Sequence, residues 1–300
     1  MRLFYLSTVL CCVVMLYGCS KAQGVAEPAK PSQTYEGDAD EKLSDRANAE
    51  ADSLRSRIST ELEGLPKHAW AGSYYQGDGL GENVSLILAP KHGYLFEWHG
   101  CMGLYDRNYG NVTVNQASLK LSFTYPNVRQ GFQGIADEFL SISWGDRQYL
   151  IPKNDVIGFC NDVNSGDEPR QRPHGRFLLR DGDESIAVTG IPKLPAKYNA
   201  YLLKHPIEAQ VVEIGAKTTR PSVCEWNFID TEIVLNVGTN AGILPGMELH
   251  VVEPDDVVQT IEIKTVAKSQ CTGVMTQMDD EDEQIQVGWK LSTRQRWNAQ

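Results

Sequence analysis

The chain has 300 residues, which is enough for about two domains of ordinary size. It carries 39 acidic and 28 basic residues, and its formal net charge is −11. A field of that sign repels phosphate backbones, so we expect no nucleic acid among the partners.

An apolar run opens the chain. Residues 3 to 18, LFYLSTVLCCVVMLYG, are uncharged and follow Arg2. The run is too short to cross a hydrocarbon core of roughly 30 Å comfortably as a helix. We therefore predict a signal peptide over residues 1–18, whose removal with Arg2 would change the charge to −12. Nothing after Gly18 is apolar for long enough to span a membrane.

The end of this run, Leu16-Tyr-Gly-Cys19, resembles the lipobox of bacterial lipoproteins. The resemblance implies that Cys19 is acylated and becomes the first residue, and that Ser20 directs the protein to the outer membrane, facing the periplasm. Several acyl chains on one residue, each methylene contributing about 0.8 kcal/mol, hold a domain on a bilayer stably. Residues 19–39 are polar and read as a flexible linker.

Seven cysteines are present, of which two lie in the predicted signal peptide and Cys19 would take the lipid. An even number in an oxidising compartment predicts disulfides. Of three connectivities we favour the one that keeps each pair inside one domain and closes loops of about fifty residues. The alternative, a four-thiolate zinc site, lacks the close spacing of such sites, so we expect no metal. The favoured pairs are Cys101–Cys160 and Cys224–Cys271.

Residues 40–64 have the pattern of an amphipathic helix, ending at Gly64 and Pro66. We expect this helix to lie on the first domain. A coiled-coil dimer seam is the alternative, but fewer than four heptads are present. The apolar positions recur at three or four residues: Leu43, Ala47, Ala51, Leu54, Ile58 and Leu62.

From Trp70 the apolar period changes to two, which predicts antiparallel strands that form a barrel or sandwich over residues 65–190. RFLLRDGDESIAVTG reads as a further hairpin around Asp181-Gly182. The residues predicted to share a face within each strand are Leu86 and Leu88; Tyr94, Phe96 and Trp98; Leu119, Leu121 and Phe123; and Leu140, Ile142 and Trp144.

The opening WAGSYYQGDG, followed by a succession of short strands, resembles the calycins, the barrel class of lipocalins. The resemblance implies an antiparallel barrel closed at one end by a Trp. Independently, the aromatic strand positions are candidates to line a cavity for an apolar or aromatic ligand. They can equally fill the barrel, as in small closed barrels. The candidate lining residues are Trp70, Tyr94, Phe96, Trp98, Phe123 and Trp144.

Residues 191–206 read as a connector with a short helix over PAKYNAYLLK, between Pro195 and Pro206. A second β-rich unit follows over residues 207–293, and residues 294–300 form a tail. Its segment LNVGTNAGILPGMELHVV suggests tight reversals at glycines and a type II turn at Pro245-Gly246. The glycines stand at four-residue steps: Gly238, Gly242 and Gly246.

This pattern over residues 230 to 292 resembles the small SH3-like or OB-like barrels of bacterial envelope proteins. It is most similar to the C-terminal domain of the flagellar assembly protein T family. A fold-level likeness implies a small β-barrel and carries no function. The expected class is therefore mainly β: an N-terminal amphipathic helix, an antiparallel barrel or sandwich, and a second small barrel.

One stretch, YLFEWHGCMGLYDRNYGN, is rich in chemically active groups. Glu97 and His99 share a face of a strand and, with His92 or Asp106, could hold a divalent metal or act as an acid and base. The simpler interpretation is the polar outer face of a half-buried strand. The acidic run Asp279 to Glu283 lacks the alternation of a calcium loop and reads as a hairpin turn.

Three functions follow, in decreasing order of expectation. The first is a lipid-anchored, non-enzymatic scaffold that meets an envelope protein partner, with no cofactor and no catalytic residue. The second is a module that binds an apolar or aromatic ligand in the first barrel. The third is a metal-dependent hydrolase that uses Glu97 and His99.

Overall fold

The computed structural model describes residues 37–77, 81–123, 136–167, 169, 177–221, 227–278 and 284–296. Side chains are described from residue 48 onward, except those of Glu82 and Phe123. The chain divides into two compact units, Met1–Arg46 and Ala47–Gln300. The predicted signal peptide, Cys19 and most of the predicted linker lie outside the described residues.

The predicted amphipathic helix is present as α1 (Gly37–Glu63). It ends where the amide of Gly64 donates to the carbonyl of Glu61, one residue short of the predicted end. Ala51, Leu54 and Ile58 are buried against Ala89 and Leu95 of the first barrel. The apolar stripe therefore packs on the first barrel, as expected.

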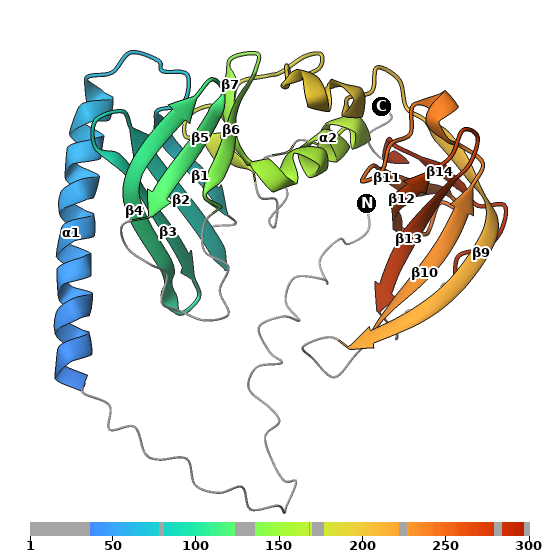
Figure 1. Ribbon diagram of the computed structural model, residues 1–300, viewed down its shortest axis with the longest axis horizontal. Helices are drawn as coiled ribbons and strands as arrows, with labels where there is room; N and C mark the ends of the chain where they lie inside the picture. The colour runs from blue at the N-terminus through green and yellow to red at the C-terminus, as the bar shows by residue number, and fades with distance from the viewer. Residues whose placement is uncertain are drawn as a thin grey trace, which may run out of the picture. The chain divides into compact units, whose positions relative to one another are not determined.

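The first barrel is an up-and-down sheet in which each strand pairs with the next (Figure 1). It is closed because β8 pairs with β1. This settles the choice between barrel and sandwich. Its strands are β1 (Gly72–Gly77), β2 (Glu82–Ala89), β3 (Gly93–Gly100), β4 (Gly103–Asn115), β5 (Ser118–Phe123), β6 (Glu138–Trp144), β7 (Arg147–Pro152) and β8 (Leu178–Arg180).

Alternation along the strands places one set of side chains inside this barrel. The inner cluster comprises Tyr74, Leu86, Leu88, Tyr94, Phe96, Leu119, Leu121, Phe139, Leu150 and Leu178. The turn between β2 and β3 needs Gly93, because its φ is +78° and a Cβ there would lie 1.9 Å from the carbonyl oxygen of Gly110. The predicted two-residue period was thus correct for β2, β3 and β5.

A second helix, α2 (Val156–Ser165), lies within residues 65–190, where the sequence predicted only strands. After the short helix η2 (Lys153–Asp155), Val156, Phe159 and Cys160 are buried on the outer face of β6, β7 and β8. Gly166 ends the helix with φ +84°. The spacing of the buried residues is helical, but the polar run that follows hid it.

The predicted hairpin around Asp181-Gly182 was wrong. Only its first arm is a strand, β8, because that arm pairs with both β1 and β7 and closes the barrel. The connector holds a 3₁₀ helix, η4 (Ala196–Tyr201), which begins after Pro195 as expected and is shorter than predicted.

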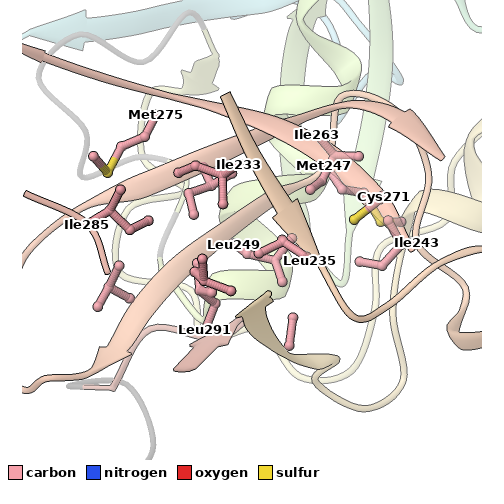
Figure 2. Packing of buried hydrophobic residues seen from close by; sticks show 14 of the residues in the cluster. Ile233, Leu235, Ile243, Met247, Leu249, Ile263, Cys271, Met275, Ile285 and Leu291 are labelled. Carbon is pink, nitrogen blue, oxygen red and sulfur yellow. The ribbon is translucent and has the colours of Figure 1, made fainter. Parts of the chain in front are cut away.

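The predicted second β-rich unit is present as a barrel of six strands in the closed order β10-β13-β12-β11-β14-β9. The strands are β9 (Glu208–Pro221), β10 (Asn227–Leu235), β11 (Glu248–Glu253), β12 (Thr260–Val266), β13 (Cys271–Met278) and β14 (Lys290–Ser292). Its core is aliphatic, with Ile233, Leu249 and Leu291 fully buried at its centre (Figure 2).

The three glycines that stand at four-residue steps in the second barrel are required for two different structural reasons. Gly242, which ends η5 (Thr239–Ala241), has φ +88°, and Gly246 has φ +84°, as tight reversals require. Gly238 is extended, so the expectation of a left-handed residue was wrong there. It must be glycine because a Cβ would lie 2.3 Å from the carbonyl oxygen of Ala267.

Candidate functional site

The carboxylate of Glu97 lies between the helix α1 and the first barrel. Arg107 of β4, directly opposite in the strand register, donates from Nε to Oε1 at 2.9 Å, and Arg55 of α1 donates to Oε2. Arg107 also donates to Asn48 Oδ1 at 2.5 Å. Glu97 is 4% exposed. Its two oxygens therefore join α1 to the barrel.

Burial by itself raises the pKa of Glu97, but the hydrogen bonds and charges of Arg55 and Arg107 outweigh burial and hold the pKa below its ordinary value. A carboxylate that stays ionised and is occupied by two guanidinium groups is a poor general acid. It is also a poor metal ligand, because a cation would have to displace both arginines.

Only one of the other candidate residues of the possible metal or acid–base set, His99, lies near Glu97. His99 Nε2 lies 3.7 Å from Glu97 Oε2 on the outer face, whereas Asp106 is opposite Trp98 in the register and so faces the inside. His92 contacts Glu61 instead. Over the described parts of the chain, no group of three or more potential ligands could hold a metal ion. Glu97 and His99 therefore do lie close together, as their shared face predicts, but neither Asp106 nor His92 joins them as the third ligand that the metal or acid–base hypothesis needs.

The predicted disulfide between Cys101 and Cys160 is absent. Cys160 is a free thiol with no exposed surface, packed in α2 against the barrel, and burial raises its pKa to about 12. Cys101 is exposed at the turn between β3 and β4. Cys271 is also a free, buried thiol, in the apolar core of the second barrel (Figure 2). Its predicted partner Cys224 lies outside the described residues.

The candidate lining residues divide into three groups. Tyr94 and Phe96 belong to the inner cluster, and Trp70 and Trp98 pack against it, as predicted. Trp144 does not, because it packs outside the barrel in the α2 cluster and donates to the carbonyl of Thr189 at 3.4 Å. The side chain of Phe123 lies outside the described residues.

Polar groups inside the first barrel bond one another. Tyr94 Oη donates to Asn108 Oδ1 at 3.1 Å, and Tyr74 Oη donates to the carbonyl of Trp70 at 2.9 Å. Burial raises the pKa of Tyr74 to about 12, although Arg180 beside it acts in the opposite direction. These hydroxyls stay protonated at neutral pH, and the contacts are those of a packed core.

Two hollows lie beside α1. One has a volume of about 520 Å³ and the other about 350 Å³, and Arg57 lines both. We call the two together the α1 groove. The first is lined by Ser56, Arg57, Thr60, Glu61, Gly64, Leu65, Lys91 and His92, and the second by Ala49, Glu50, Ser53, Leu54, Arg57 and Tyr109.

Three strands of the second barrel extend past its closed part. β14 pairs with β9 only at Glu208 to Gln210, whereas β9 continues beside β10 to Pro221, and β10 beside β13 to Met278 (Figure 1). We call the segments 215–221, 227–230 and 276–278 the ribbon. Arg220 Nε donates to Asp230 at 2.8 Å, and its guanidinium lies 4.6 Å from the ring centre of Phe228. Arg220 covers one face of the Phe228 ring, and Phe228 is half-buried.

Sequence reasoning missed most of this arrangement. The pairing of Arg55 with Glu97 joins residues 42 positions apart, and no local pattern carries it. The sequence does contain one signal of the ribbon, because Lys217 to Arg220 are four consecutive polar residues without a turn residue among them. The groove had none.

Comparisons with protein-family models, with curated proteins and with solved structures found no match. The resemblances to the lipobox, the calycins and the flagellar assembly protein T family therefore stay predictions. None of the helices in the described parts of the chain has both the length and the apolar character that crossing a lipid bilayer requires.

Proposed function

We propose that the protein is a lipid-anchored, non-enzymatic interaction module of the bacterial envelope, tethered through Cys19 to the outer membrane and facing the periplasm. The ribbon is the surface that meets its protein partner. The tether is supported by the apolar run and the lipobox-like Leu16-Tyr-Gly-Cys19 at its end.

One observation carries the interaction role, which is that the β9 part of the ribbon is open to solvent on both faces. Residues 215 to 221 are all exposed, although they belong to strand β9. Strands that bury neither face gain little hydrophobic stabilisation and are marginal in water. The ribbon also presents Met278, 39% exposed, directly opposite Phe228. A partner that covers it would bury apolar surface at little ordering cost, because the strands are already formed.

The contacts of the chemically active side chains support a non-enzymatic role. Glu97 is fully engaged by two arginines, and the thiol of Cys160 is held protonated by burial. The alternative is an apolar ligand inside the first barrel. It is less favoured because the inward side chains of Tyr74, Leu86 and Tyr94 have no exposed surface that a ligand could contact. The hollows described above lie outside that barrel.

The tether is tested by fractionating cells that produce the full chain or its Cys19→Ala variant. We expect the full chain in the outer-membrane fraction and the variant retained with its signal peptide, seen as a mass increase. A wild-type N-terminus without acyl chains, measured by mass spectrometry, would overturn the lipid anchor.

The interaction role is tested by photo-crosslinking in intact cells that make the protein at its native level. A photoreactive phenylalanine replaces Thr218 or Thr219 of the ribbon, and, as the matched control, Val258, which is 70% exposed outside it. We expect an adduct with a second protein from the ribbon positions alone. Adducts equally strong at Val258, or none at either ribbon position, would contradict the assignment.

A further inference from the structure

We propose that the partner of the ribbon contributes an extended segment, which pairs with the open edge of β9 at residues 217 to 221 as one further strand of the sheet. This inference rests on the proposed function, because it states how the partner binds to the surface assigned above. The recognition is by main-chain hydrogen bonds, so the partner is defined by a segment that can lie extended and not by its charge.

The two edges of β9 differ in how far they are paired. On one edge, β10 pairs with β9 from Val211 to Pro221. On the other edge, β14 pairs only with residues 208 to 210, and two backbone bonds then join Val211 to the loop before β14. Among the residues that the structure describes, no backbone group pairs with this second edge beyond Val211. The edge is therefore open to the N–H and C=O groups of another chain.

The usable part of this edge is short. The register between β9 and β10 shifts between Thr231 and Ile233, so that β9 has a bulge before Lys217, and bulges interrupt pairing. From Lys217 to Pro221 each residue has one partner in β10. Lysine and proline are residues that proteins place on edges to limit uncontrolled pairing. They bound a segment that suits one short strand, since strands begin at about three residues.

The open edge continues an edge that the protein itself already uses. β14 lies antiparallel to β9 at Glu208 to Gln210, and β10 lies antiparallel to it on the other side. A partner segment beside residues 217 to 221 would occupy the same side of β9 as β14, farther along the strand. The geometry for accepting a strand on this side is therefore present in the fold.

The backbone is the main feature that this segment offers to a partner. Lys217, Thr218, Thr219 and Arg220 are polar and exposed, and Arg220 is already bound to Asp230. A partner that packed on one face would therefore bury little apolar surface of β9. In contrast, β10 already holds this backbone extended, so only the partner's own segment has to be ordered on binding.

An added strand and a partner packed on one face make different contacts. Side chains alternate along a strand, so Thr218 and Arg220 point to one face of the ribbon and Lys217 and Thr219 to the other. A strand at the edge lies beside all four, with opposite Cβ atoms about 4.5–5.5 Å apart. A partner on one face contacts only every second residue.

Photo-crosslinking in intact cells that make the full chain at its native level distinguishes the two. A photoreactive phenylalanine replaces Lys217, Thr218, Thr219 or Arg220, one in each variant, and the exposed Val258 outside the ribbon as the control. We expect adducts of comparable yield with the same second protein from all four positions, and none from Val258.

Adducts at alternate positions only would overturn the added strand and leave the ribbon as the interaction surface. No adduct from any of the four would overturn the ribbon itself, and this inference with it. Adducts with the mass of two copies of the chain would assign the edge to self-pairing instead of a separate partner.

Proline variants test the main-chain bonds directly. Successive N–H groups of a strand point to opposite edges, so either Thr218→Pro or Thr219→Pro removes an N–H from the open edge, and the other removes a bond to β10. Thermal unfolding identifies the variant that keeps its pairing with β10. With the photoreactive residue at Lys217, that variant should lose about tenfold in adduct yield.

The matched controls are Thr218→Ala and Thr219→Ala, which remove the side chains and keep both N–H groups. We expect both to retain the adduct. Full adduct yield in both proline variants, or an equal loss in the alanine variants, would overturn recognition through the main chain.

Discussion

The two helices that cover the first barrel are held to it by different forces. α2 buries Val156, Phe159 and Cys160 against the barrel. α1 buries a narrower stripe rich in alanine and adds the two-arginine clamp on Glu97. Apolar burial does not depend on pH, whereas a carboxylate clamp does. The comparison indicates that α2 is an integral part of the barrel and that α1 is a separately removable cover.

The largest expected effect is in α2. Phe159 is fully buried, with ring contacts to Tyr149 and Phe177 at 5.4 and 5.3 Å between ring centres. Phe159→Ala should lower the free energy of unfolding by about 3–5 kcal/mol, because the space cannot collapse. Urea unfolding measures it, with the partly buried Val163→Ala as control. A loss below about 1 kcal/mol would mean that α2 is not part of the core.

The next effect is in α1. Glu97→Ala leaves Arg107 partly buried without its carboxylate, and should cost about 1–3 kcal/mol. Hydrogen exchange should show the loss at amides of α1, with the barrel strands unchanged. His99→Ala is the control, because His99 is half-exposed and stands 3.7 Å from the same carboxylate. Equal loss of protection in the strands would show that α1 and the barrel unfold together.

The sequence predicted which residues share a face better than which face points inward. Leu140, Ile142 and Trp144 do lie on one face of β6, but that face meets α2, and Phe139 points into the barrel instead. An apolar period of two does not show which face points into the barrel when a helix covers the outer face, because both faces are then buried. Missing α2 therefore misplaced Trp144 and put Cys160 in a disulfide.

Other features were predicted only where they depend on residues close together in the sequence. The α1 stripe and the shared faces of the strands in the first barrel follow from local periodicity, which the sequence contains. The clamp on Glu97 and the α1 groove depend on how α1, β4 and the turn at Gly93 meet. Those contacts join distant residues, so composition and spacing do not reveal them.

At acid pH the stabilities of the two helices should differ more than at neutral pH. The pKa of Glu97 lies below its ordinary value of 4.5 in the folded protein, so the clamp stabilises fully above that value and is lost as the pH falls through the lower, folded pKa. From about pH 6 to about pH 3, α1 should lose protection before α2 does. In the Glu97→Gln variant, the loss of protection in α1 should depend on pH no more strongly than the loss in α2. An identical pH profile in wild type and Glu97→Gln would exclude the clamp as its source.

The smallest effect tests whether the attachment of α1 is concentrated at its centre. Tyr109→Phe removes the hydroxyl that donates to Glu50 but keeps the ring against the helix. Because this contact is exposed and Glu50 can be hydrated instead, the cost should be only about 0.2–1 kcal/mol. Hydrogen exchange in α1 near residue 50 measures it beside Glu97→Ala. A loss as large as that of Glu97→Ala would mean that the contacts along α1 act as one unit, and that the helix leaves the barrel all at once instead of fraying from its N-terminal side.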